Sequence, residues 1–484
     1  MRRLFNMGWV VVGAVWAVCS AAWAAPMGFD EAKHLLARTS FGASAPVIES
    51  FARLTRAEAV ERLLSWTGKP RMTPPPPWVN EPVIAPQRLR DMTVEERQVF
   101  QRTNTERGLE MRGWWLQEMV ATPSPLTEKM VLFWHNHFVS SQQKVRQPQY
   151  LYRQNLLLRE HALGNFGAFL HAIARDPAMV IYLDSASNRK GQPNENFARE
   201  VMELFTLGEG HYTEHDVKEA ARAFTGWSID PASGAFQFRS GAHDNGFKTV
   251  LGNSGNLDGD TVLNILLARP QTAEFIVSKL WREFVSPMPD AAEVRRIASV
   301  FRDSGYNIRE ALRALLMSDA FYAPSNRAVL VKSPVDLVVG TLRQFQFSVG
   351  DAPPFALVVA QLGQNLFSPP NVKGWPGGEA WITSTTLLGR KQFLERLFAA
   401  QDRRPAMMAQ AMASTARAPV ARMQQRLQRS LAEAHFDAER WTRESGHAPE
   451  RVVLATAPQL ALPGGTDGIE IVRRLTQDPA YQLK

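Results

Sequence analysis

The sequence predicts a mainly α-helical protein: one large multi-helix globular domain with a short β-hairpin insertion near residues 236–251. Apolar residues recur three and four positions apart through most of the chain, as in 29–39, 56–66 and 93–120, which is the spacing of a buried helix stripe. The only cysteine is Cys19, so disulfides cannot stabilise the fold and burial must do so. A chain of 484 residues is long enough to bury such a core.

Proline-rich and turn-rich segments separate the predicted helices and strands. Prolines in 72–86 (MTPPPPWVNEPVIAP) cannot donate backbone hydrogen bonds, which predicts an extended connector between two helices. Residues 236–238 and 248–251 flank a turn-rich segment, 240–246, and together predict the hairpin. Helical periods then resume in 260–267, 272–285, 291–303 and 308–318.

The first 24 residues have the pattern of a secretory signal peptide. Arg2 and Arg3 precede an apolar run, 8–18, and Ala22-Trp23-Ala24 fits a cleavage site. The run is about half the length of a spanning helix, so we expect a periplasmic or secreted protein without a stable membrane span after cleavage. The arginine pair leaves open whether export is by the twin-arginine or the general route. We expect the helical domain to cover 25–400, followed by a peripheral C-terminal tail with short helices, 401–484.

The net charge of +8 is modest for a chain of this length. Lysine and arginine alternate with acids along the helices, which is typical of solvated helix faces. We therefore expect no nucleic-acid partner, whereas attraction to an anionic polymer of the cell envelope stays open.

The segment 188–227 concentrates polar residues between two apolar helix faces. A helix opened by Pro193 or Asn194 places Asn196, Glu200 and Glu203 in one row, four and three residues apart. Two neighbouring carboxylates repel, so one must take a proton, pair with a cation or bind a metal. We expect His211 to face this row from the following turn, and Thr213 with Asp216 to cap the next helix. The candidate catalytic residues are Glu200, Glu203, His211 and Asn196, although an ordinary amphipathic surface helix has the same pattern.

Two further histidines end an apolar helix in 130–138 (MVLFWHNHF). Buried imidazoles need partners. Either one of His135 and His137 satisfies a hydrogen bond in the core and the other caps the helix end, or they act as ligands or acid–base groups. Because cysteine is absent from the mature chain, a transition metal would be held by His, Asp or Glu. The candidate set for a divalent metal is His135, His137, Glu200 and Glu203. We find no nucleophile elbow, P-loop, zincin or dinucleotide motif.

The loop 368–378 is rich in proline and glycine, yet it contains Trp375 and leads to Trp381. A tryptophan in a loop must pack against the body of the protein or face a cleft.

Five blocks of the sequence together resemble the bacterial domain-of-unknown-function 1800 family. The blocks are HLLARTSFG (34–42), KMVLFWHNHF (129–138), NENFAREVMELFTLGEGHYTEHDVKEAARAFTGW (194–227), HDNGFKTVLGNSGNLDGD (243–260) and PPNVKGWPGGEAWITS (369–384). The resemblance implies an exported, mostly helical protein that acts beside a sulfatase-like partner protein of the domain-of-unknown-function 1501 family. It implies no catalytic residues.

Two functions remain open, and whether the protein is an enzyme stays undecided. The first is an exported scaffold or binding protein that uses exposed tryptophans and a basic surface to hold an envelope polymer or a partner protein. The alternative is a metal-assisted exported hydrolase that uses the His/Glu set.

Overall fold

The computed structural model describes residues 25–65, 70–402, 419–446, 448–460 and 468–484. The predicted signal peptide, 1–24, lies outside these ranges. Within them the mainly helical class with a small β insertion is confirmed. Across this described part, no helix combines the length and apolar character needed to cross a membrane.

The helices follow one another along the chain with short connections. The first group is α1 (Gly28–Thr39), α2 (Ala45–Ala52), α3 (Arg56–Ser65), α4 (Pro86–Arg90), α5 (Val94–Ala121), α6 (Pro125–His137), α7 (Pro148–Glu160), α8 (Phe166–Ala174), α9 (Pro177–Tyr182), α10 (Asn196–Glu200) and α11 (Glu214–Ala223). The second group is α12 (Gly259–Ala268), α13 (Pro270–Phe284), α14 (Ala291–Asp303), α15 (Ile308–Leu316), α16 (Asp319–Tyr322), α17 (Pro334–Gln344), α18 (Pro353–Gln361), α19 (Ser384–Asp402), α21 (Pro419–Glu433), α22 (Ala438–Ser445), α23 (Pro449–Val453) and α24 (Gly468–Gln477). Short 3₁₀ turns lie at Pro77–Asn80, Ser185–Ser187, Ser240–Ala242, Pro324–Asn326, Gly378–Trp381 and Pro479–Gln482.

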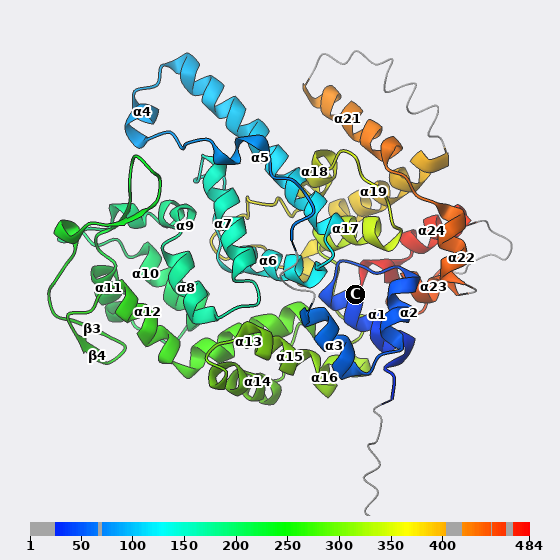
Figure 1. Cartoon of the computed structure of the whole chain (residues 1–484), viewed down its shortest axis with the longest axis horizontal. Coiled ribbons are helices and arrows are strands. Elements are labelled where there is room, and N and C mark those ends of the chain that lie inside the picture. Colours follow the sequence, from blue (N-terminus) through cyan, green and yellow to red (C-terminus); the bar gives the residue numbers. More distant parts are fainter. Residues whose placement is uncertain (1–24, 66–69, 403–418, 447, 461–467) are drawn as a thin grey trace, which may run out of the picture.

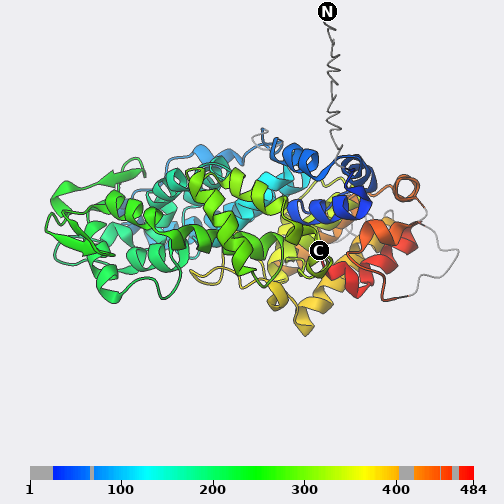
Figure 2. The same ribbon diagram turned by 90° about the horizontal axis from the view of Figure 1, so that it is seen from below.

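The helices form a flat, elongated body (Figures 1 and 2). The strands lie at one end, and helices from both ends of the chain, α1–α3 and α22–α24, gather at the other, where α2 packs against α22. The long helix α5 begins at a capping box formed by Thr93 and Glu96 and packs against α17 and α18 in the middle of the body.

The β insertion is present, but its strands pair differently from the sequence prediction. Strand β2 (Phe236–Phe238) pairs with β1 (Trp227–Ile229), and β3 (Lys248–Val250) pairs with β4 (Asn253–Gly255), both antiparallel. The predicted pairing of 236–238 with 248–251 is therefore wrong. Each of these segments has a closer partner along the chain, and two small hairpins replace the single one.

The polar segment also departs from regular α-helix. Helix α10 ends at Glu200 and continues as a π-helix, Val201–Thr206, in which the Leu207 N–H donates to the carbonyl of Met202, 2.8 Å away and five residues back. Gly208 follows with a φ of 84°, as expected for a helix-ending glycine. The predicted capping box of Thr213 and Asp216 is confirmed at the start of α11.

The last residues of the chain are packed into the body, and the peripheral tail expected from residue 401 stays a prediction. Tyr481 is fully buried, and Lys484 Nζ lies 2.7 Å from Asp336 Oδ2, while Lys129 Nζ lies 2.8 Å from Asp336 Oδ1. Burial opposes ionisation of Asp336, but these two ammonium groups hold its pKa well below its usual value. The boundary at residue 400 stays a prediction.

Candidate functional site

The candidate site is a cleft of about 440 Å³ between α6, α13 and two loops. Helix α6 contributes Asn136 and His137 from its C-terminal end, and α13 contributes Lys279 and Arg282. The loop before α17 and the Pro/Gly-rich loop that holds Trp375 complete the walls. The cleft therefore joins two of the sequence blocks singled out above, 129–138 and 369–384.

Asn136 fixes the Trp375 loop against α6. The Trp375 N–H donates to Asn136 Oδ1 at 2.7 Å, and Asn136 Nδ2 donates to the Trp375 carbonyl at 3.3 Å. The preceding Gly374 has a φ of 80°, and a Cβ there would lie 2.2 Å from Asn136 Oδ1. Only glycine fits this close approach without displacing the amide.

His135 is a buried core residue with a backbone hydrogen bond and an aromatic neighbour. Its Nε2 accepts the Phe367 N–H at 3.1 Å, and its ring lies edge-on to Trp115 with centroids 5.3 Å apart. Burial lowers the pKa of His135 to about 3, so the imidazole is neutral. Of the two alternatives left open by the sequence, the geometry matches the core hydrogen bond.

His137 is also buried, but it borders the cleft. Its Nε2 lies 3.2 Å from the Phe205 carbonyl and its Nδ1 lies 3.0 Å from Lys279 Nζ. Because a carbonyl only accepts, Nε2 carries the proton and Nδ1 accepts from the ammonium group. Burial, and then the charge of Lys279, lower the pKa of His137 well below its usual value.

Lys279 is held in the cleft wall by neutral partners. Besides His137, it donates to the Leu204 carbonyl at 3.2 Å. Burial, and then the nearby Arg282, lower the pKa of Lys279 to about 8. Within the described ranges, no carboxylate lies within ion-pair distance of Lys279 or of the exposed Arg282.

A third cation, Lys373, connects the cleft loop with the acidic row. Its Nζ lies 3.8 Å from Glu203 Oε1 and 3.5 Å from Glu209 Oε1. Both ion pairs are long, and the Lys373 side chain is 63% exposed. Each pair therefore contributes little to the stability of the fold. The acids at the far end of the cleft, Glu283 and Asp336, already pair with Lys129 and Lys484. Of the charged residues that line the cleft, the cations Lys279, Arg282, Lys373 and Lys484 outnumber the acids Glu283 and Asp336, which gives the cleft an excess of positive charge.

Glu200 and Glu203 do lie close together, as the row predicted. Burial, and then the charge of Glu203, raise the pKa of Glu200. The Tyr212 hydroxyl donates to Glu203 Oε2 at 2.5 Å, and burial with this contact raises the pKa of Tyr212 to about 12. Tyr212 thus has the place beside the carboxylates where the sequence suggested His211.

Neither of the other two predicted residues forms a hydrogen bond or ion pair with these carboxylates among the described residues, although Asn196 lies one turn before Glu200 on α10. Asn196 is exposed, and its Nδ2 donates to Asp184 Oδ2 at 3.4 Å. The exposed His211 side chain forms no hydrogen bond or ion pair with the described residues. The expected contact of His211 with the acidic row is therefore not formed, because the turn directs Tyr212 inward instead.

The predicted metal set is not assembled in this geometry. Both nitrogens of His137 and the Nε2 of His135 already form hydrogen bonds. Throughout the described ranges, no group of three or more His, Cys, Asp and Glu residues is placed to hold a metal ion.

Sequence reasoning did not single out Lys279, Arg282, Lys373 or Tyr212. The sequence pointed only to the segments that contain two of them: Tyr212 lies in block 194–227 and Lys373 in block 369–384. The two tryptophans were found, but Trp375 and Trp381 are 5% and 8% exposed. They line the cleft rather than a free surface, which corrects the expectation of exposed tryptophans.

The comparisons with known proteins give one match. The model of a family described as "Protein of unknown function (DUF1800)" matches residues 34–483, which extends past the boundary expected at residue 400. No curated protein and no solved structure matches the chain.

Proposed function

Because the chain belongs to the DUF1800 family, whose description assigns no function, we propose from the structure that it is an exported binding protein whose cleft takes an acidic polysaccharide of the cell envelope. The carrying observation is the excess of positive charge from Lys279, Arg282 and Lys373 in a cleft of about 440 Å³. A cleft of this size and charge attracts anionic groups and concentrates them at its walls.

The chemistry of the walls supports a sugar acid in particular. Trp375 and Trp381 line the cleft together with the cations. Aromatic rings pack against the apolar faces of sugars, and cations pair with carboxylates. The two hydrogen bonds between Asn136 and the Trp375 backbone, called the Asn136 clamp, keep the Trp375 loop in one position. A fixed loop lowers the entropy cost of binding. The DUF1501 partner protein stays a prediction from resemblance.

The metal-assisted hydrolase stays a prediction as well, and we do not favour it. Three of its four candidate ligands, His135, His137 and Glu203, already form hydrogen bonds within the protein. A binding function requires no rearrangement of these residues.

The test is calorimetric titration of the purified full-length protein with polygalacturonate, with uncharged dextran as the control ligand. We expect saturable binding of polygalacturonate only. The double variant Arg282→Gln/Lys373→Gln should bind about tenfold more weakly, since each exposed charge pair contributes up to about 1 kcal/mol. Lys218→Gln, an exposed lysine on α11, is the matched control and should bind like the wild type. Equal binding by wild type and double variant, or binding of dextran, would overturn the proposal.

A further inference from the structure

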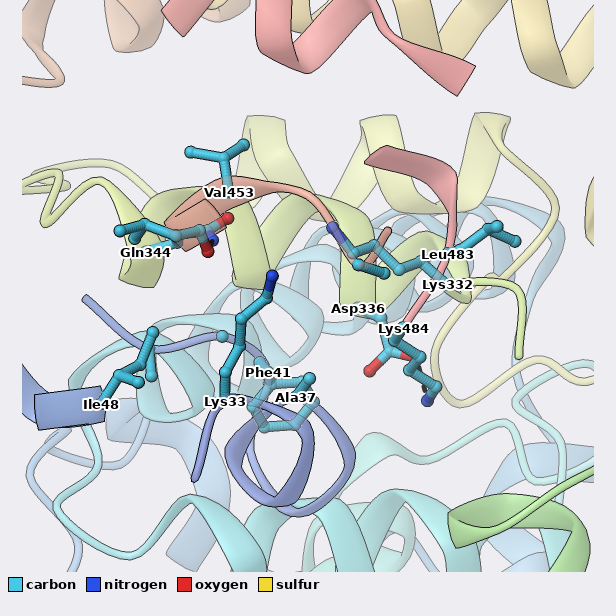
Figure 3. Close-up of a pocket in the computed structure, with 14 residues that line it drawn as sticks. Lys33, Ala37, Phe41, Ile48, Lys332, Asp336, Gln344, Val453, Leu483 and Lys484 are labelled. Atoms are coloured by element: carbon cyan, nitrogen blue, oxygen red, sulfur yellow. Dashed lines mark hydrogen bonds and ion pairs between the residues drawn. The ribbon is translucent and has the colours of Figure 1, made fainter. Parts of the chain in front are cut away.

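A second, smaller cavity lies on the other side of the Asp336–Lys484 pair (Figure 3). It measures about 50 Å³ and is lined by residues of α1, α2, α17, α23 and the chain end. Its walls are mostly apolar, with Ile48, Val452 and Val453 among them, but Lys33 and Lys332 also reach it. Figure 3 shows these two side chains extending from opposite sides toward the same space.

Among the residues that the structure describes, neither lysine has a carboxylate within ion-pair distance. Lys33 Nζ donates to the carbonyls of Arg451, at 2.6 Å, and Leu454. The ammonium group of Lys332 forms no hydrogen bond or ion pair with the described residues, and its contact is the face of the Tyr481 ring, 3.6 Å from Nζ to the centroid. A partly buried ammonium group with no acceptor is unfavourable unless something else supplies one.

The surrounding charges make the charged form of Lys332 still less favourable. Lys33, Arg390 and Lys484 all act on Lys332 with the same sign, and Asp336 alone opposes them. Both oxygens of Asp336 already accept from Lys129 and Lys484. Burial, only partly offset by Asp336, lowers the pKa of Lys332 to about 7, and burial lowers that of Lys33 to about 8.

We propose that this cavity binds one small oxyanion, such as phosphate or a short carboxylate, between the ammonium groups of Lys33 and Lys332. A space of about 50 Å³ accommodates roughly four water-sized groups, which matches such an ion. The anion supplies the acceptor that Lys332 lacks, and the apolar walls strengthen the attraction because they exclude water. The site is separate from the cleft and does not depend on the proposed polysaccharide.

The test is calorimetric titration of the full-length protein with inorganic phosphate and, separately, with acetate, at constant ionic strength set by chloride. We expect one oxyanion per chain, and the ion that binds more tightly identifies the chemistry. Lys332→Met and Lys33→Met should each weaken this binding at least about tenfold. The cleft variant Arg282→Gln/Lys373→Gln should retain wild-type affinity, which separates this site from the cleft.

A second readout is the midpoint of thermal unfolding. Phosphate or acetate should raise the midpoint of the wild type, and the increase should be lost in Lys332→Met. If Lys332→Met does not fold, Lys33→Met decides the result. Absence of saturable oxyanion binding by the wild type, unchanged affinity in the folded lysine variants, or loss of binding in the cleft variant would each overturn the proposal.

Discussion

At the scale of single residues, burial determines which candidate groups carry charge. His135 and His137 are neutral because the interior disfavours the imidazolium ion. Lys279 is less deeply buried and keeps its proton up to a pKa of about 8. At neutral pH the cleft wall therefore has one charged ammonium group donating to one neutral imidazole.

The lysine in this pair should make stability depend on pH. Lys279 is charged in both states below about pH 8, but between its folded pKa of about 8 and the usual 10.5 the unfolded chain binds more protons. The free energy of unfolding should therefore rise with pH in this window. In urea unfolding at pH 8 and pH 10, Lys279→Met should reduce the rise by about 2 kcal/mol, whereas exposed Lys218→Met should preserve it. Parallel pH profiles for wild type and Lys279→Met would contradict this assignment.

The neighbouring carboxylates Glu200 and Glu203 should affect the pH dependence of stability in the opposite direction to Lys279. The pKa of Glu200 is raised in the folded protein, so its ionised form is disfavoured there. The free energy of unfolding therefore falls as pH rises through that pKa. Glu200→Gln should increase the free energy of unfolding at pH 7, and the gain should disappear near pH 4, where the carboxyl is protonated in both states. Glu160→Gln, an exposed glutamate on α7, should change neither value. A loss of stability in Glu200→Gln would show that the carboxylate has a stabilising partner.

At the scale of elements, two local backbone features position the site. The π-helix Val201–Thr206 turns the carbonyls of Leu204 and Phe205 toward Lys279 and His137. Such segments are rare and often lie at functional sites. The sequence predicted the helix and the proximity of its two glutamates correctly from α-helical spacing. It could not predict the wider turn, which depends on tertiary hydrogen bonds to α6 and α13.

The second feature, the Trp375 loop, depends on one glycine. Gly374→Ala should destabilise the protein by about 1–3 kcal/mol, because the new Cβ would meet Asn136 Oδ1 in a backbone conformation that alanine disfavours. It should also weaken polygalacturonate binding, since Trp375 would shift. Gly350→Ala is the matched control because a Cβ there meets nothing within 4 Å. Chemical denaturation of both variants measures the difference, and equal stabilities would show that the clamp is not required.

At the scale of the whole molecule, a charged centre ties the C-terminal end of the chain to two helices of the body. Asp336 on α17 joins Lys129 of α6 with Lys484 at the chain end. The helical class and most helix positions could be predicted because periodicity is a local property of the sequence. The strand partners, the inward-packed chain end and the cleft cations Lys279 and Lys373 depend on contacts between distant segments. A single sequence does not report such contacts, so these features were missed.

The charged centre should be essential for stability. Asp336→Asn removes the buried carboxylate from two buried ammonium groups and leaves them only the longer contacts with Glu283, which should cost about 3–5 kcal/mol of unfolding free energy. Asp303→Asn, an exposed aspartate at the end of α14, is the control and should lie within about 0.5 kcal/mol of the wild type. Urea unfolding at neutral pH compares the three proteins. A small effect of Asp336→Asn would mean that the chain end is only weakly attached to the body.

The cleft itself is the feature on which the proposed function depends. The most direct test is a crystal structure of the protein saturated with a short oligogalacturonate. The account predicts the sugar in the cleft, with a carboxylate within hydrogen-bond distance of Arg282, Lys373 or Lys279 and a ring against Trp375 or Trp381. An empty cleft at saturating ligand, or a sugar bound only elsewhere on the protein, would contradict it.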